Sequence, residues 1–485
     1  MNSVFQQAEL RVYRHQPGRT SRGTRVVYWM QQAQRVWVNP ALDYAILRSL
    51  EMNLPLELWF VLYPDIPSAQ AKHYQFMIEG IADTSRTLKE LGMDLRVMVS
   101  QKVEFPPELL QSTALLVLDH GYLNWQKELR DKVFEAPDSA SLEIVEIDTE
   151  AVVPVHLASE KEEYSAATLR HKILSKMNGF LVKQAPIGIM KPAKEKRQAI
   201  AHEYPGDTSD PNALWAWAQS VLSLSAKNLS PVSLGSSHTK AMDTLRFFIR
   251  EHLQDYALLR NHPELDVQSN MSAFLHFGQI SPIEIMMEIC EQTGIPVEAL
   301  PGMIADRSRL SGMHQSVANY AEELIVRREL AMNFCNYNPD YESHLSLPEW
   351  ARKSLNDHLA DPREAYYSLD RIEQGETDDI YWNAAQKQML SSGKMHNYMR
   401  MYWGKRILAW FPSVEDAYGI LAWLNNKYEM DGRDANGWAG IAWCFGKHDR
   451  PWAERPIYGM VRYMNAAGLK RKFDIEAYVS KWSNG

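Results

Sequence analysis

The residues that most suggest chemistry in this 485-residue chain lie between positions 382 and 473. Eight of the fifteen Trp residues stand from Trp382 onward, mixed with Arg, Asn and Tyr rather than with aliphatic residues. Three segments are densest: GKMHNYMRMYWGKRILAW from residue 393, LNNKYEMDGRDANGW from residue 424 and RPIYGMVRYMNAAGLKRKF from residue 455. Protein cores are usually built from Leu, Ile and Val, with Trp as an occasional large residue. This composition therefore favours a surface that stacks on planar rings and orients them with polar groups.

The first of these segments predicts a helix over residues 393–411 that ends at Pro412. Trp403 and Trp410 are seven residues apart in it, so they share one face and lie about 10 Å apart along the axis. Trp382 belongs to the preceding segment and can pack nearby. Two interpretations are open: ordinary core aromatics, or a relay of indoles that passes an electron between a buried redox cofactor and solvent.

A second candidate site is the segment LDVQSNMS at residues 265–272, which precedes the apolar run AFLHFGQISP. Ser and Asn before an apolar run are typical helix N-caps, and the free amides of a first helical turn can hold a phosphate. An ordinary helix start is the commoner explanation of such a pattern. Gly278, followed by Ser281 and Pro282, predicts a helix end and a new capped start.

The segment DGRDANG at residues 431–437 is either a turn with Asx caps or a fragment of a calcium loop. The EF-hand pattern needs a Glu six residues after the Gly and acidic groups at alternate positions, and this segment has neither. We therefore expect no metal site here. The acidic side chains are better placed to pair with Arg400 or to accept hydrogen bonds from a heterocycle.

Composition excludes several classes of protein. No apolar run approaches the roughly 18 residues that cross a bilayer, and the N-terminus lacks a signal-peptide pattern. The three Cys lack metal-ligand spacing, so we expect a reducing, cytoplasmic compartment. The formal charge is −8, yet residues 391–485 hold 14 Lys and Arg against 9 Asp and Glu. That basic segment is either a phosphate-facing surface or an ordinary solvated face.

The elements that must position these residues fall into two classes. Apolar runs at residues 25–30, 56–63, 94–99, 114–118 and 141–148 alternate with helical patterns, which predicts a parallel sheet covered on both faces. No GxGxxG follows the first strand. Beyond about residue 213 the periodicity is helical. We predict a flexible lead-in (1–24), an open α/β domain (25–160), a linker (161–212) and an all-helical domain (213–485).

Taken together, several stretches in chain order resemble the photolyase/cryptochrome family, and specifically its class II cyclobutane pyrimidine dimer photolyases. They are RVVYWMQQAQRV, VVPVHLASEKEEY, SNMSAFLHFGQISP, AEELIVRRELAMNFC, YWNAAQKQMLSSGKMHNYMRMYWGKRILAW, LNNKYEMDGRDANGWAGIAW and RYMNAAGLKRKFD. The resemblance implies an N-terminal Rossmann-like α/β antenna domain and a C-terminal helical domain that holds FAD in a bent form. One departure is a shorter loop at residues 447–449.

The resemblance also implies roles by position. The residues that would line FAD are Tyr256, Ser269, Asn270, Met271, Ser272, Glu323, Arg327, Asn397, Arg400, Asn425, Asp431 and Asn436. Among them, Arg400 and Asp431 would form an ion pair beside the isoalloxazine, with Asn425 near the flavin N5. The residues that would touch the dimer are Glu323, Met401 and Trp443. Those of the photoreduction relay would be Trp403, Trp382 and Trp410.

The implied reaction is light-driven: excited FADH⁻ donates an electron to a pyrimidine dimer flipped out of DNA, the ring bonds split and the electron returns. The protein would position the cofactor and the flipped dimer, set the electrostatic environment and exclude water. We expect UV-damaged DNA as partner, no membrane, a monomer, and a cytoplasmic, DNA-associated location that is nuclear in a eukaryote. Phosphate contacts are expected from Lys405, Arg406, Arg462 and residues 470–472.

Two matters stay open from the sequence. An antenna chromophore, a deazaflavin or a folate, would need only a shaped and mostly apolar cleft in residues 25–160. The alternative function is a cryptochrome-like blue-light photoreceptor that keeps FAD and the relay without repair. The presence of Glu323, Met401 and Trp443 favours repair, because a sensor needs no dimer-binding surface.

Overall fold

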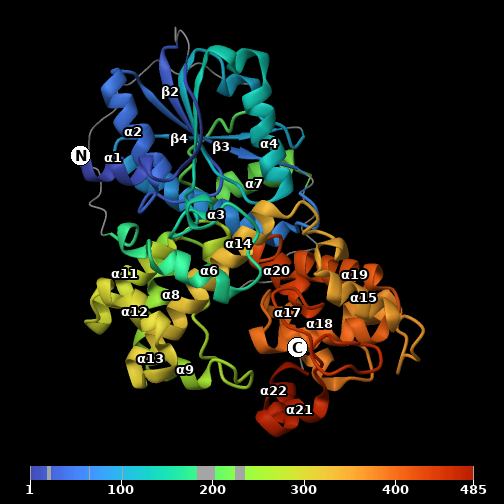
Figure 1. The fold of residues 1–485 in the computed structure, drawn as a ribbon. Helices are drawn as coiled ribbons and strands as arrows, with labels where there is room; N and C mark the ends of the chain where they lie inside the picture. Colours follow the sequence, from blue (N-terminus) through green and yellow to red (C-terminus); the bar gives the residue numbers. More distant parts are fainter. Residues whose placement is uncertain are drawn as a thin grey trace.

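The N-terminal part of the computed structural model is a six-stranded sheet in the order β1-β6-β5-β2-β3-β4 (Figure 1). The structure describes residues 2–18, 23–64, 66–100, 102–182, 202–223 and 235–483. The strands are Val12–Gln16 (β1), Arg25–Met30 (β2), Leu56–Leu62 (β3), Leu95–Val99 (β4), Thr113–Asp119 (β5) and Glu143–Ile147 (β6). Strands β2 to β6 pair in parallel and β1 pairs antiparallel with β6. The predicted open, largely parallel sheet is confirmed.

Both faces of this sheet are buried, which explains the unbroken apolar runs of its strands. In β2, Tyr28 and Met30 enter one core, whereas Val27 and Trp29 enter the other. The first core is covered by Asn2–Glu9 (α1), Pro40–Met52 (α2), Ala71–Glu90 (α3) and Pro211–Val221 (α7). The second is covered by Asn124–Glu135 (α4).

The segment predicted as a flexible lead-in, residues 1–24, is structured over most of its described part. It holds α1 and β1, and β1 forms the edge of the sheet beside β6. Arg11 is buried and donates to the carbonyl oxygens of Ala151 and Val152 at 2.8 and 2.9 Å. β1 is an edge strand and none of its five residues is fully buried, so it needs no apolar pattern and its polar sequence gave no strand signal.

The segment predicted as a linker, residues 161–212, also contains packed elements. Helix Ala166–Leu174 (α6) belongs to a helical core, and Tyr204 donates its amide to Val97 of β4 at 2.8 Å. Helix α7 begins at Pro211 and packs against α3 of the sheet domain. The packing therefore places α7 with the sheet, while the predicted boundary fell inside this helix. Residues 183–201 of the predicted linker lie outside the described residues.

The remainder of the chain is helical, as predicted. Its helices are His238–Glu251 (α8), Tyr256–Leu259 (α9), Ser272–His276 (α10), Pro282–Thr293 (α11), Leu300–Ala305 (α12), Gly312–Ala321 (α13), Arg328–Tyr337 (α14), Glu349–Asp357 (α15), Leu369–Gln374 (α16), Ile380–Ser392 (α17), Asn397–Trp410 (α18), Val414–Tyr428 (α19), Ala435–Cys444 (α20), Ala466–Lys472 (α21) and Ile475–Trp482 (α22). Of the helices that the structure describes, none is long and apolar enough to cross a membrane.

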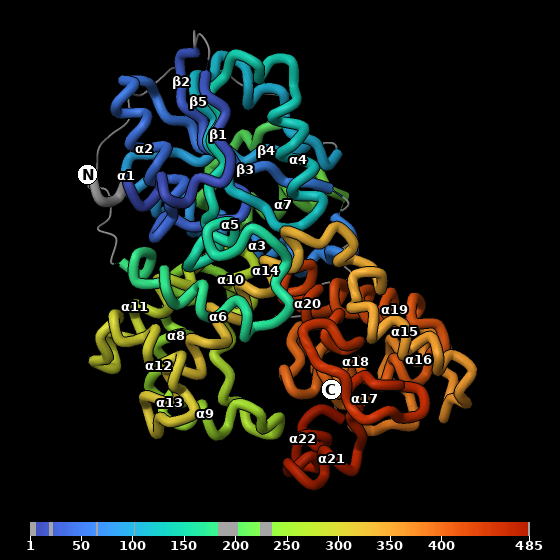
Figure 2. Tube along the Cα trace, viewed as in Figure 1, coloured from blue at the N-terminus to red at the C-terminus, as the bar shows by residue number. Residues whose placement is uncertain are grey.

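These helices form two groups with separate cores, side by side beneath the sheet domain (Figure 2). One core is built from α6 and from the helices between α8 and α13, and the other from the helices between α14 and α22. A six-residue π-helix, Glu322–Arg327 (η8), joins α13 to α14 and links the two groups. Such π-turns are rare and frequently mark functional sites. The predicted functional residues come from both groups.

The helical part contacts the sheet domain at the carboxyl ends of the strands. Asp119, at the end of β5, accepts hydrogen bonds from the amides of Gln31, Gln32 and Ala33. Gly278 has φ +63°, and a Cβ there would lie 1.7 Å from the carbonyl oxygen of Gln32. Only glycine fits this approach, so the helix end predicted at Gly278 is also a point of close contact between the two parts of the chain.

Candidate active site

Helix α18 presents the cation around which the site is built. The helix begins at Asn397, four residues later than the predicted helix, because Gly393 (φ +69°) ends α17 and His396 caps α18 through Nδ1 at 3.2 Å from the Tyr398 amide. Arg400 Nη2 lies 2.8 Å from Asp431 Oδ1 and 2.7 Å from Glu429 Oε2. Burial alone would lower the pKa of Arg400, but these carboxylates raise it above its ordinary value. The contact expected between Arg400 and Asp431 is present.

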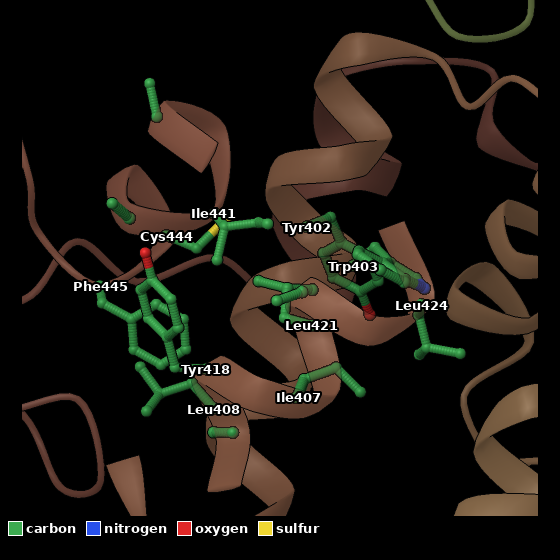
Figure 3. Close-up of a cluster of buried hydrophobic side chains, with 14 of the residues drawn as sticks. Tyr402, Trp403, Ile407, Leu408, Tyr418, Leu421, Leu424, Ile441, Cys444 and Phe445 are labelled. Carbon is green, nitrogen blue, oxygen red and sulfur yellow. The ribbon is translucent and has the colours of Figure 1, made fainter. Parts of the chain in front are cut away.

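The three predicted relay indoles are in ring contact. Trp382 stacks on Trp403 with centroids 6.2 Å apart and meets Trp410 edge-on at 5.2 Å. Trp382 Nε1 donates to the carbonyl oxygen of Trp403 at 3.0 Å, and Trp403 Nε1 donates to Gln386 at 2.9 Å. All three indoles are buried, and Figure 3 shows Trp403 beside Leu424 in their common core. The three indoles are therefore part of the hydrophobic core, and they also form a continuous series of rings in contact.

The loop at residues 269–272 connects the two helical groups. Lys394 binds the side chain of Asn270, which has φ +59°, and lies 3.6 Å from Asp266. Ser269 contacts Tyr320, whose ring meets that of Tyr256 at 5.4 Å. The expected capping is not found here, because Met271 occupies the N-cap of α10 without a side-chain hydrogen bond and Ser272 is the first residue of that helix. The expected start at Ser281 is confirmed, since its Oγ accepts from the Ile283 amide at 3.2 Å.

The π-helix sends two neighbouring carboxylates in different directions. Glu323 is partly exposed and receives a hydrogen bond from Arg260 Nη1 at 2.7 Å. Glu322 is buried and is surrounded by three arginines: Arg170 at 2.6 Å, Arg327 at 3.4 Å and Arg307 at 3.6 Å. These arginines lower the pKa of Glu322 against the effect of burial.

On the other helical group, the half-buried Trp443 faces this cluster. The Arg327 guanidinium lies 5.3 Å from the centre of its indole ring. The contact brings together α20 and the π-helix, which are more than a hundred residues apart in the sequence.

The other predicted residues take varied positions. Asn425 is buried and donates to Asn426 Oδ1 at 3.1 Å. Met401 is partly buried against the core of its helical group. Asn397 and Asn436 are exposed at the first turns of α18 and α20.

The basic positions expected to contact phosphate divide into exposed and buried ones. Arg462 and residues 470–472 are accessible, but Lys405 is 1% exposed and bonds the carbonyl oxygen of Cys444. Arg406 is held by Asp379 at 2.9 Å. The expectation for Lys405 is therefore wrong, because its position on α18 turns it into the core.

An exposed aromatic surface near the C-terminus was not predicted. Trp452 is 42% exposed and lies between Arg450 and Arg462, whose guanidinium carbons are 5.5 and 5.4 Å from its ring. Tyr463 is 37% exposed and has Arg455 5.3 Å from its ring. The arginines thus hold cations against two partly exposed aromatic rings.

Sequence reasoning also missed Glu429, Lys394 and Arg260. Glu429 and Lys394 lie inside the candidate segments KYEMDGRD and GKMH, so their position in the sequence could have identified them as site residues. Arg260 had none, because its contact with Glu323 spans 63 residues.

Comparisons with known proteins agree with this arrangement. The sequence model of the DNA photolyase family matches residues 26–186. The chain is 42% identical, over 95% of both sequences, to a deoxyribodipyrimidine photo-lyase of Methanothermobacter thermautotrophicus. It is 35% identical, over 94% of its length and 81% of the relative, to one of Potorous tridactylus. A class III photolyase structure from Agrobacterium tumefaciens shares the fold, with a TM-score of 0.67 at 16% identity over 96% of this chain and 88% of that one. The chain therefore belongs to the DNA photolyase family, as its resemblance to the photolyases implied.

Proposed function

We propose that this protein is a light-dependent DNA repair enzyme that splits cyclobutane pyrimidine dimers with FAD as its cofactor. The strongest support is the 42% identity, over nearly the whole length of both chains, to a protein named deoxyribodipyrimidine photo-lyase. The three indoles in ring contact, starting three residues after Arg400, add support from the site itself.

The residues of the site fit an FAD. Arg400, paired with Asp431 and partly buried, would offer a cation to the isoalloxazine, and the buried Asn425 would offer an amide. Lys394 and Asn270, joined across the two helical groups, are suited to the pyrophosphate, and Tyr256 to the adenosine. Reduced FAD, when bound, supplies the electron that light releases. The protein's part is to hold the ring, keep water out and favour its anionic form electrostatically.

The lesion would lie between the π-helix and α20. Arg260 orients the Glu323 carboxylate at 2.7 Å, so that the carboxylate can accept a hydrogen bond from a ring N–H of the dimer. Trp443 would stack on the lesion, and Met401 would contact it from α18. The arginines around the buried Glu322 leave an excess of positive charge beside this space, which suits the phosphates that flank a flipped base.

The relay would restore the reduced flavin after oxidation. We propose that Trp403 is nearest the flavin, because it lies on α18 with Arg400, and donates the electron to it; Trp382 then reduces Trp403, and Trp410 reduces Trp382. Ring contact at each step supports this order.

We further propose that Trp452, with Arg450 and Arg462, meets the DNA around the lesion. Exposed aromatic rings stack on unpaired bases of any sequence, and the arginines add phosphate contacts. Binding would then be local, which suits a protein whose formal charge is −8. We propose a monomer at a DNA-associated location.

An antenna chromophore also has a candidate cavity. A hollow of about 640 Å³ opens at the carboxyl ends of β3 and β4 and is lined by Pro64, Val99, Ser100, His202, Trp217, Val221, Leu222 and Ser223. Open α/β sheets bind ligands at this edge. Titration with a deazaflavin or a folate should quench Trp fluorescence in the wild type and less in Trp217→Phe.

The test of the proposed function is repair of an oligonucleotide with a single thymine dimer by purified, reduced protein in blue light and in darkness. Restored thymine only in the light is expected. A bound, photoreducible flavin without repair in either condition would contradict the proposal and favour a photoreceptor. Undamaged oligonucleotide, and protein whose flavin is kept oxidised in darkness, serve as controls.

A further inference from the structure

Arg400 carries two carboxylates on one nitrogen, although a single carboxylate balances its charge. Asp431 and Glu429 approach Nη2 at 2.8 and 2.7 Å. They differ in exposure, since the side chain of Asp431 is 16% exposed and that of Glu429 is 1% exposed. Two carboxylates this close do not readily ionise together, and the more buried one is the one that keeps a proton.

The surroundings of Glu429 come from four elements. Helix α3 contributes Lys72, whose Nζ donates to the carbonyl oxygen of Tyr428 at 2.7 Å, and His73, whose Nε2 lies 3.1 Å from the carbonyl oxygen of Glu429. The segment between α17 and α18 contributes Lys394, and α22 contributes Tyr478. The fourth element is α18, with Arg400.

The charges around Glu429 oppose one another. Burial, with a further contribution from Asp431, raises its pKa to about 8, although Arg400, Lys72 and a hydrogen bond from the Met395 amide act in the opposite direction. Burial also lowers the pKa of Lys72 to about 8. Helix α3 of the sheet domain thus places a titratable cation, Lys72, near the carboxylate pair.

We propose that Glu429 is the proton-holding group of the flavin site, which keeps or takes up a proton to offset the negative charge of the reduced flavin. This inference rests on the proposed function of the site. Reduction by an external two-electron donor, with one proton taken up by the flavin, would leave one negative charge on the flavin beside Arg400. A neutral Glu429 leaves Arg400 balanced by Asp431 alone, whereas an ionised Glu429 adds a second negative charge and opposes reduction.

The proton balance gives the expected behaviour. Below about pH 8, Glu429 is neutral in both redox states, so no proton moves to or from its carboxyl group. Above that pH it is ionised with oxidised flavin, so reduction draws one proton from solvent onto its carboxylate. The flavin midpoint potential should then fall more steeply with pH, by about 30 mV per pH unit for one proton and two electrons.

The experiment is spectroelectrochemical titration of the FAD-loaded, full-length protein between pH 6 and 10. We expect the wild type to steepen near pH 8 and Glu429→Gln to keep one slope throughout. The matched control is Glu329→Gln, because Glu329 is also buried with a pKa raised to about 8 but bonds the amides of Val152 and Val153 instead of Arg400. It should retain the wild-type break.

A second variant tests the direction of the effect. Lys72→Met removes a cation that favours ionised Glu429, so the break should move to higher pH. Equal slopes in the wild type and Glu429→Gln, or a break that Lys72→Met leaves in place, would overturn the inference. Failure to bind FAD at all would instead refute the proposed function, which keeps the two apart.

Discussion

Replacing Glu429 with Gln should make the folded protein more stable than the wild type above neutral pH. The folded protein holds this proton with a pKa of about 8, whereas the ordinary value is 4.5. Between these values the folded state is protonated and the unfolded state is not, so the free energy of unfolding decreases as pH rises. Each pH unit in this window costs about 1.4 kcal/mol.

The size of the effect follows from that window. At pH 7 the cost is about 3 kcal/mol, and above pH 8 it reaches a limit of about 5 kcal/mol. Because the side chain is 1% exposed, solvent screening reduces these values little. Gln does not titrate, so its free energy of unfolding lacks this pH dependence. The difference between the variant and the wild type should therefore grow by about 3 to 4 kcal/mol in favour of the variant between pH 5 and pH 8.

The assay is urea unfolding of both proteins, loaded with oxidised FAD, at several pH values and followed by Trp fluorescence. Glu298→Gln is the control, because Glu298 is exposed and its replacement should follow the wild type at every pH. A constant difference between Glu429→Gln and the wild type from pH 5 to pH 9 would refute the reasoning. It would mean that Glu429 is ionised throughout.

The remaining predictions concern the relay, the lesion and the DNA surface. Trp382→Phe should stop light-driven flavin reduction while pre-reduced enzyme still repairs, because Trp382 contacts both other indoles; undiminished photoreduction, measured by flavin absorbance, would contradict this. Glu323→Ala should lower the repair yield about tenfold, the value of one charge-assisted hydrogen bond, with FAD content unchanged; a normal yield per bound flavin counts against the assignment. Arg462→Ala should weaken lesion-DNA binding and reduce its salt dependence by about one phosphate contact. Trp452→Ala should weaken binding by about 1–3 kcal/mol with the salt dependence intact; the same salt response in both variants would argue against separate roles.

The strands were predictable because their side chains are buried on both faces. Residues 25–30 became β2 with the bounds predicted, and the run at residues 56–63 became Leu56–Leu62. The edge strand β1 was missed for the opposite reason, since no residue of VYRHQ is fully buried and the segment shows no apolar periodicity. The position of α7 was also beyond the sequence, because only the fold shows that it packs on α3.

The site was predictable where local spacing carried the information. Trp403 and Trp410 share a helix face, whereas the specific pairing of Arg400 with Asp431, 31 residues apart, was expected from the family resemblance. Contacts that depend on tertiary structure could not be derived, such as Arg260 with Glu323 and Lys394 with Asn270. Lys405 was wrongly expected to be exposed. A lysine in a basic segment is usually exposed, and only the orientation of the helix shows that this one is buried.

The most direct test of the proposed repair reaction is a single saturating blue flash on pre-reduced enzyme bound to dimer-containing DNA. We expect each flash to restore up to one pair of thymines per enzyme and to leave the flavin reduced, because the electron returns. Thymine recovery that consumes one reduced flavin per dimer, or no recovery from a fully reduced complex, would contradict it.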